Sequence, residues 1–376
     1  MKPHPMVIRQ LVISTMICVS CDTGVCSVAE AKSEDYARLS VFYATDREAK
    51  VFPRKNKYYF GKQTDPSSSS NLIYGIENFK TRIPAELSLK GNWRSAFTLD
   101  IFGDEHEPRG MKFRTFKGVT YGYVYGADQK EQFFGQLSGC LSKCPTNELV
   151  VFIHGCCVDH QQAVRQTANL QKWFKRPVIL YDWGTVSKVY YQSLLAYPRT
   201  QDRFKGFVSE LKRRYPDTKI TLIAYSVGSN ILKDFCLSTD QGVTKQFENV
   251  IVLRGDTSVK ALEEALPAVV KQSVNPVQIW VSSNDSQMIA SRLLRTITRL
   301  PAKVVSLKGP RAGETMAWKE KKFEGVDVFD VSHLGLGHEI PYKLIPVYGR
   351  SSLREGENGE YKLTRLENHV FEIKKH

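Results

Sequence analysis

The stretch LIAYSVGSN, residues 222–230, decides the fold, because it carries Ser226 between two different hydrophobic patterns. The residues before the serine, TKITLIA (218–224), are apolar and β-branched, and they predict a buried strand. The residues after it, SNILKDFCL (229–237), carry apolar side chains at helical spacing. A serine at a sharp strand-to-helix turn has the geometry of a nucleophile elbow, in which the hydroxyl projects at the top of a sheet.

The five residues from Ala224 to Gly228 read A-x-S-x-G, where the usual elbow pattern is G-x-S-x-G. Small residues flank an elbow because the tight turn brings helix and strand close together, and alanine can meet that need. A small serine at an ordinary turn of an α/β protein would give the same five letters. To interpret Ser226 as a catalytic nucleophile therefore requires a base, an acid to orient the base, and an oxyanion hole elsewhere in the chain.

From about residue 145 the sequence alternates between apolar strand patterns and amphipathic helix patterns. This alternation predicts a mostly parallel sheet with helices on both faces, and with the elbow it indicates an α/β-hydrolase fold. We expect a single domain over residues 32–350, with a catalytic core at about 145–345. Residues 351–376 are polar and charged, and they predict a surface tail.

Candidates for the acid and the base follow Ser226 in the order that α/β-hydrolases use, which is serine, then Asp or Glu, then histidine. The predicted strand VQIWVSSND ends in Asp285, and the loop VSHLGLGHEI after the last predicted strand supplies His333 and His338. We favour Asp285 as the acid. His338 is favoured as the base because its glycine-rich loop lets an imidazole reach across the sheet edge.

Two alternatives stay open for these roles. Asp256, in LRGDTS after the preceding predicted strand, is a rival acid, and His333 is a rival base that lies closer to its strand end. Both Asp256 and Asp285 could also simply cap the helices that follow them.

The oxyanion hole needs two backbone N–H groups. One is expected from Val227, directly after the nucleophile, and the other from the loop after VVFIHG, where Cys156 follows Gly155. Gly155 permits a close approach of the backbone. The neighbouring thiols of Cys156 and Cys157 lack an elbow, so we interpret them as pocket residues and not as nucleophiles.

Five motifs in order, VFYATDR, VVFIHG, IAYSVGSN, WVSSNDSQMIAS and GHEI, resemble a bacterial α/β-hydrolase family catalogued as a domain of unknown function. The resemblance covers about residues 39–345, and members of the family are described as esterase- or lipase-like. It implies Ser226 as the nucleophile, Asp285 as the acid and His338 as the histidine. The chain departs from the family at HGCCVDH, where a Tyr-Asn pair commonly follows His-Gly, and at YDWG, which replaces a Ser-Trp-Pro stretch.

The N-terminus predicts a secretory signal peptide over residues 1–31. A basic head with Lys2 and Arg9 precedes a short apolar run, LVISTMICVS, and Ala29-x-Ala31 offers a cleavage site. The run is too short to span a membrane, and no later stretch predicts a transmembrane helix. We therefore expect a periplasmic or extracellular protein, with a lipoprotein anchored at Cys21 as the less favoured alternative.

The 376 residues, 42% hydrophobic and 24% charged, have the composition of a globular protein with a net charge of +14. Such a charge favours contact with an anionic envelope surface, although a well-solvated surface explains it equally well. No nucleic-acid-binding module is recognisable. Cys140 and Cys144 are spaced to bond across a turn, and no pattern of Cys and His at ligand spacing predicts a metal site.

Together these patterns predict an exported serine hydrolase that cleaves a small-molecule or lipid carboxylic ester and needs no metal or organic cofactor. An acyltransferase, a thioesterase or a peptidase would use the same triad, because the acceptor depends on pocket shape and water exclusion. A non-catalytic envelope-binding protein on the same fold is the alternative from another functional class.

Overall fold

A computed structural model of the chain describes most of the residues after Asn71, together with three shorter segments before it. Residues 1–27, which hold most of the predicted signal peptide, lie outside this description, so export stays a prediction of the sequence. The described residues are 28–29, 36–52, 57–64, 72–82, 123–125, 130–185, 190–240, 242–297, 309–315, 318, 323–349, 356–358, 361–366 and 369–375.

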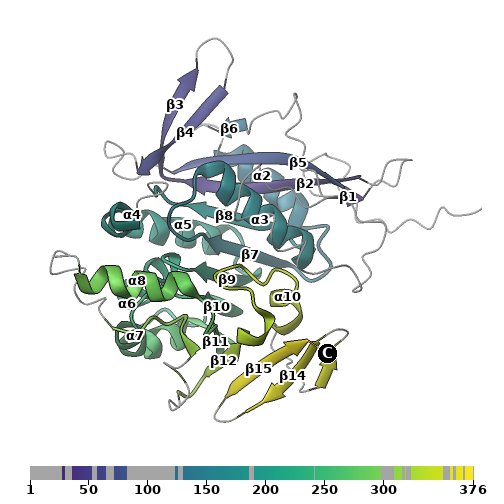
Figure 1. Cartoon of the computed structure of the whole chain (residues 1–376). Coiled ribbons are helices and arrows are strands. Elements are labelled where there is room, and N and C mark those ends of the chain that lie inside the picture. The colour runs from purple at the N-terminus through teal and green to yellow at the C-terminus, as the bar shows by residue number, and fades with distance from the viewer. Residues whose placement is uncertain are drawn as a thin grey trace, which may run out of the picture.

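A 13-stranded sheet runs through the molecule (Figure 1) in the order β13-β14-β15-β12-β11-β10-β9-β7-β8-β2-β5-β6, with β1 paired on β2. The strands from β2 to β15 along this order are mutually parallel, which confirms the predicted fold class. The strands of the sheet are β1 (Val28–Ala29), β2 (Tyr36–Thr45), β5 (Ile73–Arg82), β6 (Tyr123–Tyr125), β7 (Glu148–Ile153), β8 (Val178–Asp182), β9 (Lys219–Tyr225), β10 (Asn249–Leu253), β11 (Val277–Val281), β12 (Val326–Asp330), β13 (Gly356–Asn358), β14 (Tyr361–Arg365) and β15 (Val370–Lys375). A separate hairpin pairs β3 (Arg47–Phe52) with β4 (Lys57–Thr64).

Helices cover both faces of the sheet, and a separate apolar core fills the space on each side. One core packs the sheet against α2 (Lys130–Leu141), α5 (Gln201–Arg214), α6 (Gly228–Ser238) and α7 (Val259–Gln272). The other packs it against α3 (His160–Phe174) and the short α10 (Ile345–Tyr348). The remaining described helices are α4 (Tyr190–Ala196), α8 (Ser286–Ile297) and the 3₁₀ turns η3 (Tyr197–Thr200) and η5 (Ser332–Leu334).

The central strands are buried on both faces, because helices lie above and below them. Every residue of β8, β10 and β11 is buried, as expected for near-continuous apolar runs in a parallel sheet. Their carboxyl ends meet at one edge of the sheet, which is where sites form in open α/β folds. This edge carries the loops after β7, β9, β10, β11 and β12, in which all the candidate site residues lie.

The C-terminal segment differs from the prediction. The sequence predicts a polar tail over 351–376, whereas the described part forms β13, β14 and β15, and β15 pairs in parallel with β12. In β14 the buried Tyr361 and Leu363 alternate with polar residues, whereas in β15 the four residues 370–373 are all buried. Short strands with charged residues beside the buried ones resemble a solvated tail when neighbouring strands are not considered.

The pairing of Cys140 with Cys144 that their spacing permits is not formed. Among the described cysteines, Cys144, Cys156, Cys157 and Cys236 are not in disulfide bonds.

Candidate active site

Ser226 occupies a sharp turn between β9 and α6, as the elbow pattern predicts. Its φ of 51° lies in the left-handed region, which is rare for a residue with a side chain. Two backbone bonds hold the turn against the loop after β10: the Ser226 N–H donates to the Leu253 carbonyl at 2.9 Å, and the Ser226 carbonyl accepts from the Asp256 N–H at 3.0 Å. The strained conformation is therefore fixed from the neighbouring strand.

The side chains of Ser226, His338 and Asp285 form a continuous hydrogen-bonded chain. His338 Nε2 lies 3.0 Å from Ser226 Oγ, and His338 Nδ1 lies 2.7 Å from Asp285 Oδ2. An ionised Asp285 accepts a hydrogen bond from Nδ1–H, which keeps the proton of the neutral imidazole on Nδ1 and leaves Nε2 free to accept the hydroxyl proton of Ser226. Three residues from the loops after β9, β11 and β12 thus have the geometry of a nucleophile, a base and an acid.

The surroundings of Asp285 keep it charged although it is buried. Burial by itself raises the pKa of this carboxyl, but the nearby His338, the Arg254 guanidinium and the Met288 N–H outweigh it and lower the pKa below its ordinary value. Arg254 is fully buried, and its Nη1 lies 4.0 Å from Asp285 Oδ2. Among the described residues, no hydrogen-bond partner is found for its three guanidinium nitrogens, so its action on Asp285 is electrostatic.

The loop that carries His338 is fixed by glycines and by one tyrosine. Gly335 and Gly337 both have positive φ values, of 63° and 56°, which glycine adopts readily. The Tyr225 hydroxyl donates to the His338 carbonyl at 2.5 Å. Tyr225, the last residue of β9, therefore holds the backbone of His338 close to Ser226.

The two alternatives from the sequence lie apart from this chain of hydrogen bonds. Asp256 accepts from the hydroxyls of Ser291 and Tyr190, each at 2.5 Å. His333 is 54% exposed and pairs with Glu372 at 2.7 Å. The structure thus brings Asp285 and His338 to Ser226. Asp256 instead supports the elbow, because its backbone N–H donates to the Ser226 carbonyl.

Two backbone segments flank Ser226 where oxyanion donors are expected. Val227 is the N-cap residue of α6, at a helix end where N–H groups lack intrahelical partners. The loop after β7 approaches the elbow so closely that a Cβ on Gly155 would lie 2.9 Å from the Cβ of Ser226. Cys156 and Cys157, both partly buried, follow directly, with their Sγ atoms 3.0 Å apart.

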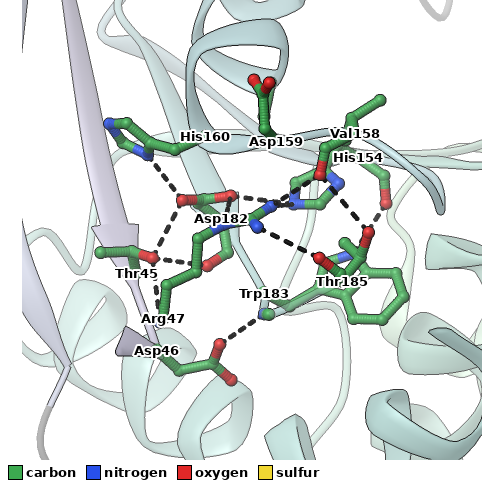
Figure 2. A network of polar contacts seen from close by, with 12 residues as sticks. Thr45, Asp46, Arg47, His154, Val158, Asp159, His160, Asp182, Trp183 and Thr185 are labelled. Atoms are coloured by element: carbon green, nitrogen blue, oxygen red, sulfur yellow. Dashed lines mark hydrogen bonds and ion pairs between the residues drawn. The ribbon is translucent and has the colours of Figure 1, made fainter. Parts of the chain in front are cut away.

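Some residues that shape the site could not be assigned from the sequence. Tyr225 and Arg254 lie within the quoted stretches LIAYSVGSN and LRGDTS, but no pattern distinguishes them from ordinary polar residues near strand ends. A buried polar network behind the loop of Cys156 joins residues of VFYATDR and YDWG, whose motifs the sequence interpretation noted without giving them a role (Figure 2).

Among the described residues, no group of three or more His, Cys, Asp or Glu side chains is placed to hold a metal ion. Within the same residues, no helix combines the length and the apolar character needed to cross a membrane.

The profile of the family described as "Alpha/beta hydrolase of unknown function (DUF900)" matches residues 129–343. The chain belongs to this α/β-hydrolase family. The matched region includes the elbow, the loops after β7, β10 and β11, and His338. No curated protein matches the chain.

Two solved structures similar to this family member come from bacteria. Phospholipase PlaB from Legionella pneumophila, in complex with thio-NAD, is 13% identical with a TM-score of 0.26, and the match covers 49% of this chain and 37% of the phospholipase chain. The product of the gene lin2722 from Listeria innocua is 10% identical with a TM-score of 0.34, over 60% of this chain and 97% of that one.

Proposed function

We propose that this α/β-hydrolase family member is a serine hydrolase that cleaves carboxylic esters by transferring the acyl group to water. The observation that carries the proposal is the hydrogen-bonded chain from Ser226 through His338 to Asp285, built on a strained elbow. This arrangement activates a hydroxyl that is a weak nucleophile on its own.

In the first step Ser226 Oγ attacks the ester carbonyl while His338 Nε2 takes its proton over the 3.0 Å contact. The charged Asp285 stabilises the imidazolium that forms and holds its tautomer. His338 then gives the proton to the departing alcohol, and an acyl-serine remains. In the second step His338 takes a proton from water as the water oxygen attacks the acyl carbonyl. The bond between the acyl carbon and Ser226 Oγ then breaks, the carboxylic acid leaves, and His338 returns the proton to Ser226 Oγ.

Charge that develops on the carbonyl oxygen needs donors that are already in place. The N–H groups of Val227 and Cys156 would supply them. Val227 follows Ser226 and Cys156 follows Gly155, and Ser226 and Gly155 lie close together at the elbow. Loss of one such donor typically lowers turnover by roughly 10²–10³-fold.

A fluorophosphonate probe and a series of p-nitrophenyl esters of increasing acyl length test the proposal on the purified protein. We expect labelling at Ser226 and ester hydrolysis, and we expect Ser226→Ala to abolish both without loss of folded protein. A folded protein that neither labels nor hydrolyses would be the non-catalytic binding protein instead.

The neighbouring enzyme classes are distinguished by product analysis. Transfer of the acyl group to an added alcohol in preference to water would indicate an acyltransferase. Much faster cleavage of thioesters or of peptide amides than of matched oxygen esters would indicate a thioesterase or a peptidase.

A further inference from the structure

A buried network of charged and polar side chains joins the ends of the neighbouring parallel strands β2, β8 and β7 (Figure 2). Asp182, fully buried, lies at its centre. Asp182 Oδ1 accepts from Arg47 Nε at 2.7 Å, and Oδ2 accepts from Thr45 Oγ1 at 2.9 Å and from His160 Nδ1 at 2.7 Å. Segments more than a hundred residues apart in sequence are thereby tied together at the edge of the sheet that carries Ser226.

The charges within this network balance. Arg47 is one cation, and His160 is a second, because it lies between two carboxylates, 2.7 Å from Asp182 and 2.9 Å from Glu77. Two cations therefore face two anions in the protein interior. A balanced set of this kind is rigid, because removal of one member leaves an uncompensated buried charge.

The network reaches the backbone of the loop that carries Cys156. Arg47 Nη2 donates to the Val158 carbonyl at 3.2 Å, and Arg47 Nη1 donates to the Thr185 carbonyl at 3.4 Å. The Thr185 hydroxyl in turn accepts from the N–H of Cys157 at 2.9 Å. The peptide groups that follow Cys156 are therefore bonded to residues at the ends of β2 and β8.

The loop is also held on the other side of Cys156. Trp183 Nε1 donates to the His154 carbonyl at 2.9 Å, and the two rings stack. Cys157 has a φ of 66°, a conformation that a non-glycine residue keeps only where its surroundings impose it. The bond from the Cys157 N–H to Thr185 is one that imposes it.

We propose that Arg47, Asp182 and Thr185 are positioning residues that set the orientation of the Cys156 N–H as the second oxyanion donor. The inference rests on the proposed function, because an oxyanion hole has meaning only if Ser226 attacks a carbonyl or a similar centre. None of the three residues needs to touch substrate. Thr185 acts through the Cys157 amide, and Arg47 and Asp182 hold Thr185 and the loop in place.

A misplaced donor affects the transition state more than the bound substrate, because the hole is complementary to the developing oxyanion. A change that only loosens the loop should therefore lower kcat and leave KM almost unchanged. This split distinguishes positioning from a purely structural role, which would lower the amount of folded enzyme and leave the kinetics of the folded fraction intact.

Thr185→Val and Thr185→Ser form the decisive pair, since valine keeps the shape of threonine and serine keeps its hydroxyl. For a soluble p-nitrophenyl ester we expect Thr185→Val to lower kcat by about 10- to 100-fold, with KM within about twofold. Thr185→Ser should retain kcat within about threefold. Thr167→Val is the matched control, because Thr167 is a fully buried threonine whose hydroxyl bonds within α3. Its kcat should equal that of the wild type.

Melting temperatures and the rate of fluorophosphonate labelling are measured on the same proteins. Labelling also builds negative charge on an oxygen at Ser226, so Thr185→Val should slow it while the melting temperature stays close to that of Thr167→Val. Wild-type kcat and labelling rate in Thr185→Val would overturn the inference, as would an equal loss in Thr185→Ser. A wild type that labels but hydrolyses no ester would overturn the proposed function alone, since the labelling rates of the pair still test the positioning role.

Asp182→Asn is less informative on its own, because it leaves Arg47 and His160 without their shared carboxylate and is expected to destabilise the fold. Arg47→Lys keeps the charge but removes the forked contacts to Val158 and Thr185. In the folded fraction of Arg47→Lys we expect the same fall in kcat at constant KM as in Thr185→Val, and an unchanged kcat there would contradict the role given to Arg47.

Discussion

At the scale of single residues, two buried aspartates near Ser226 have different hydrogen-bond partners, and this difference predicts different roles. Asp285 accepts from the imidazole of His338, whereas Asp256 accepts from two hydroxyls. Hydroxyl donors are satisfied equally well by an amide oxygen, but the imidazole tautomer depends on an acceptor that cannot donate.

Asp285→Asn should therefore lower kcat by roughly 10⁴-fold for a soluble ester, because the amide favours the wrong tautomer of His338. Asp256→Asn should stay within about tenfold of the wild type. Steady-state kinetics of both variants, with circular dichroism to verify folding, check the expectation. A larger loss of kcat in Asp256→Asn than in Asp285→Asn would identify Asp256, which follows β10, as the acid.

The vicinal cysteines are expected to contribute their backbone and not their sulfur. The hydrogen bond between the thiols of Cys156 and Cys157 lowers the pKa of Cys157, so Cys157 should react with thiol reagents faster than an ordinary cysteine. Cys156→Ala and Cys157→Ala should each keep kcat within about threefold, because the N–H groups stay in place.

A bulky maleimide should inhibit the wild type by filling the space beside Ser226, and a saturating ester should protect it. Cys157→Ala should be inhibited less by the maleimide than Cys156→Ala. If Cys157→Ala abolished turnover while Ser226→Ala remained active, the nucleophile would be a thiolate and the proposed mechanism would be wrong.

At the scale of elements, the elbow depends on a close approach between α6 and β7. A Cβ on Gly228 would lie 2.7 Å from the His154 carbonyl oxygen and 2.8 Å from that of Ile153. Backbone atoms cannot move aside as the end of a flexible side chain can. The last residue of the A-x-S-x-G pattern is thus small because of the neighbouring strand and not because of its own conformation.

Gly228→Ala should lower the free energy of unfolding by about 1–3 kcal/mol through this clash. Gly206→Ala is the control, since nothing lies within 4 Å of its added Cβ in the middle of α5. It should raise the free energy of unfolding by about 0.5–1 kcal/mol, because alanine suits a helix better than glycine. Urea unfolding of the two variants measures both effects. An equal change in the free energy of unfolding would show that the elbow can relax around the added methyl group.

At the scale of the whole molecule, the network around Asp182 connects stability to pH. Burial by itself lowers the pKa of His160, but the carboxylates of Asp182 and Glu77 outweigh it and raise the pKa to about 9. The ordinary value in the unfolded chain is about 6.5. A raised pKa in the folded state gives a stabilisation that is complete below about pH 6.5 and is lost as pH rises through 9.

We therefore expect the free energy of unfolding to fall by about 3 kcal/mol between pH 6.5 and 9.5 through His160. His160→Gln, which cannot carry the charge, should be less stable at pH 6.5 and should lack this part of the pH dependence. Denaturant unfolding at several pH values measures the slope for both proteins. Parallel slopes for the wild type and His160→Gln would show that His160 is not charged in the folded state.

The sequence by itself determined the class of fold, the position of the elbow, and the order of Ser226, Asp285 and His338. These features depend on local periodicity and on the order of strands, and both can be read along one chain. The C-terminal strands were not predicted, because β14 and β15 are short and carry charged residues beside their buried ones. β15 pairs with β12, which precedes it by about forty residues, and β14 then pairs with β15.

Only the tertiary structure shows that Asp285, and not Asp256, is hydrogen-bonded to His338. Both aspartates follow parallel strands and lie at the same edge of the sheet. Only the distance to the imidazole of His338 distinguishes one from the other. The structure alone also joined Arg47, Asp182 and Thr185 to the loop of Cys156. Buried hydrogen bonds between side chains distant in sequence leave no periodic signal, because their specificity lies in directions and distances that exist only once the strands are side by side.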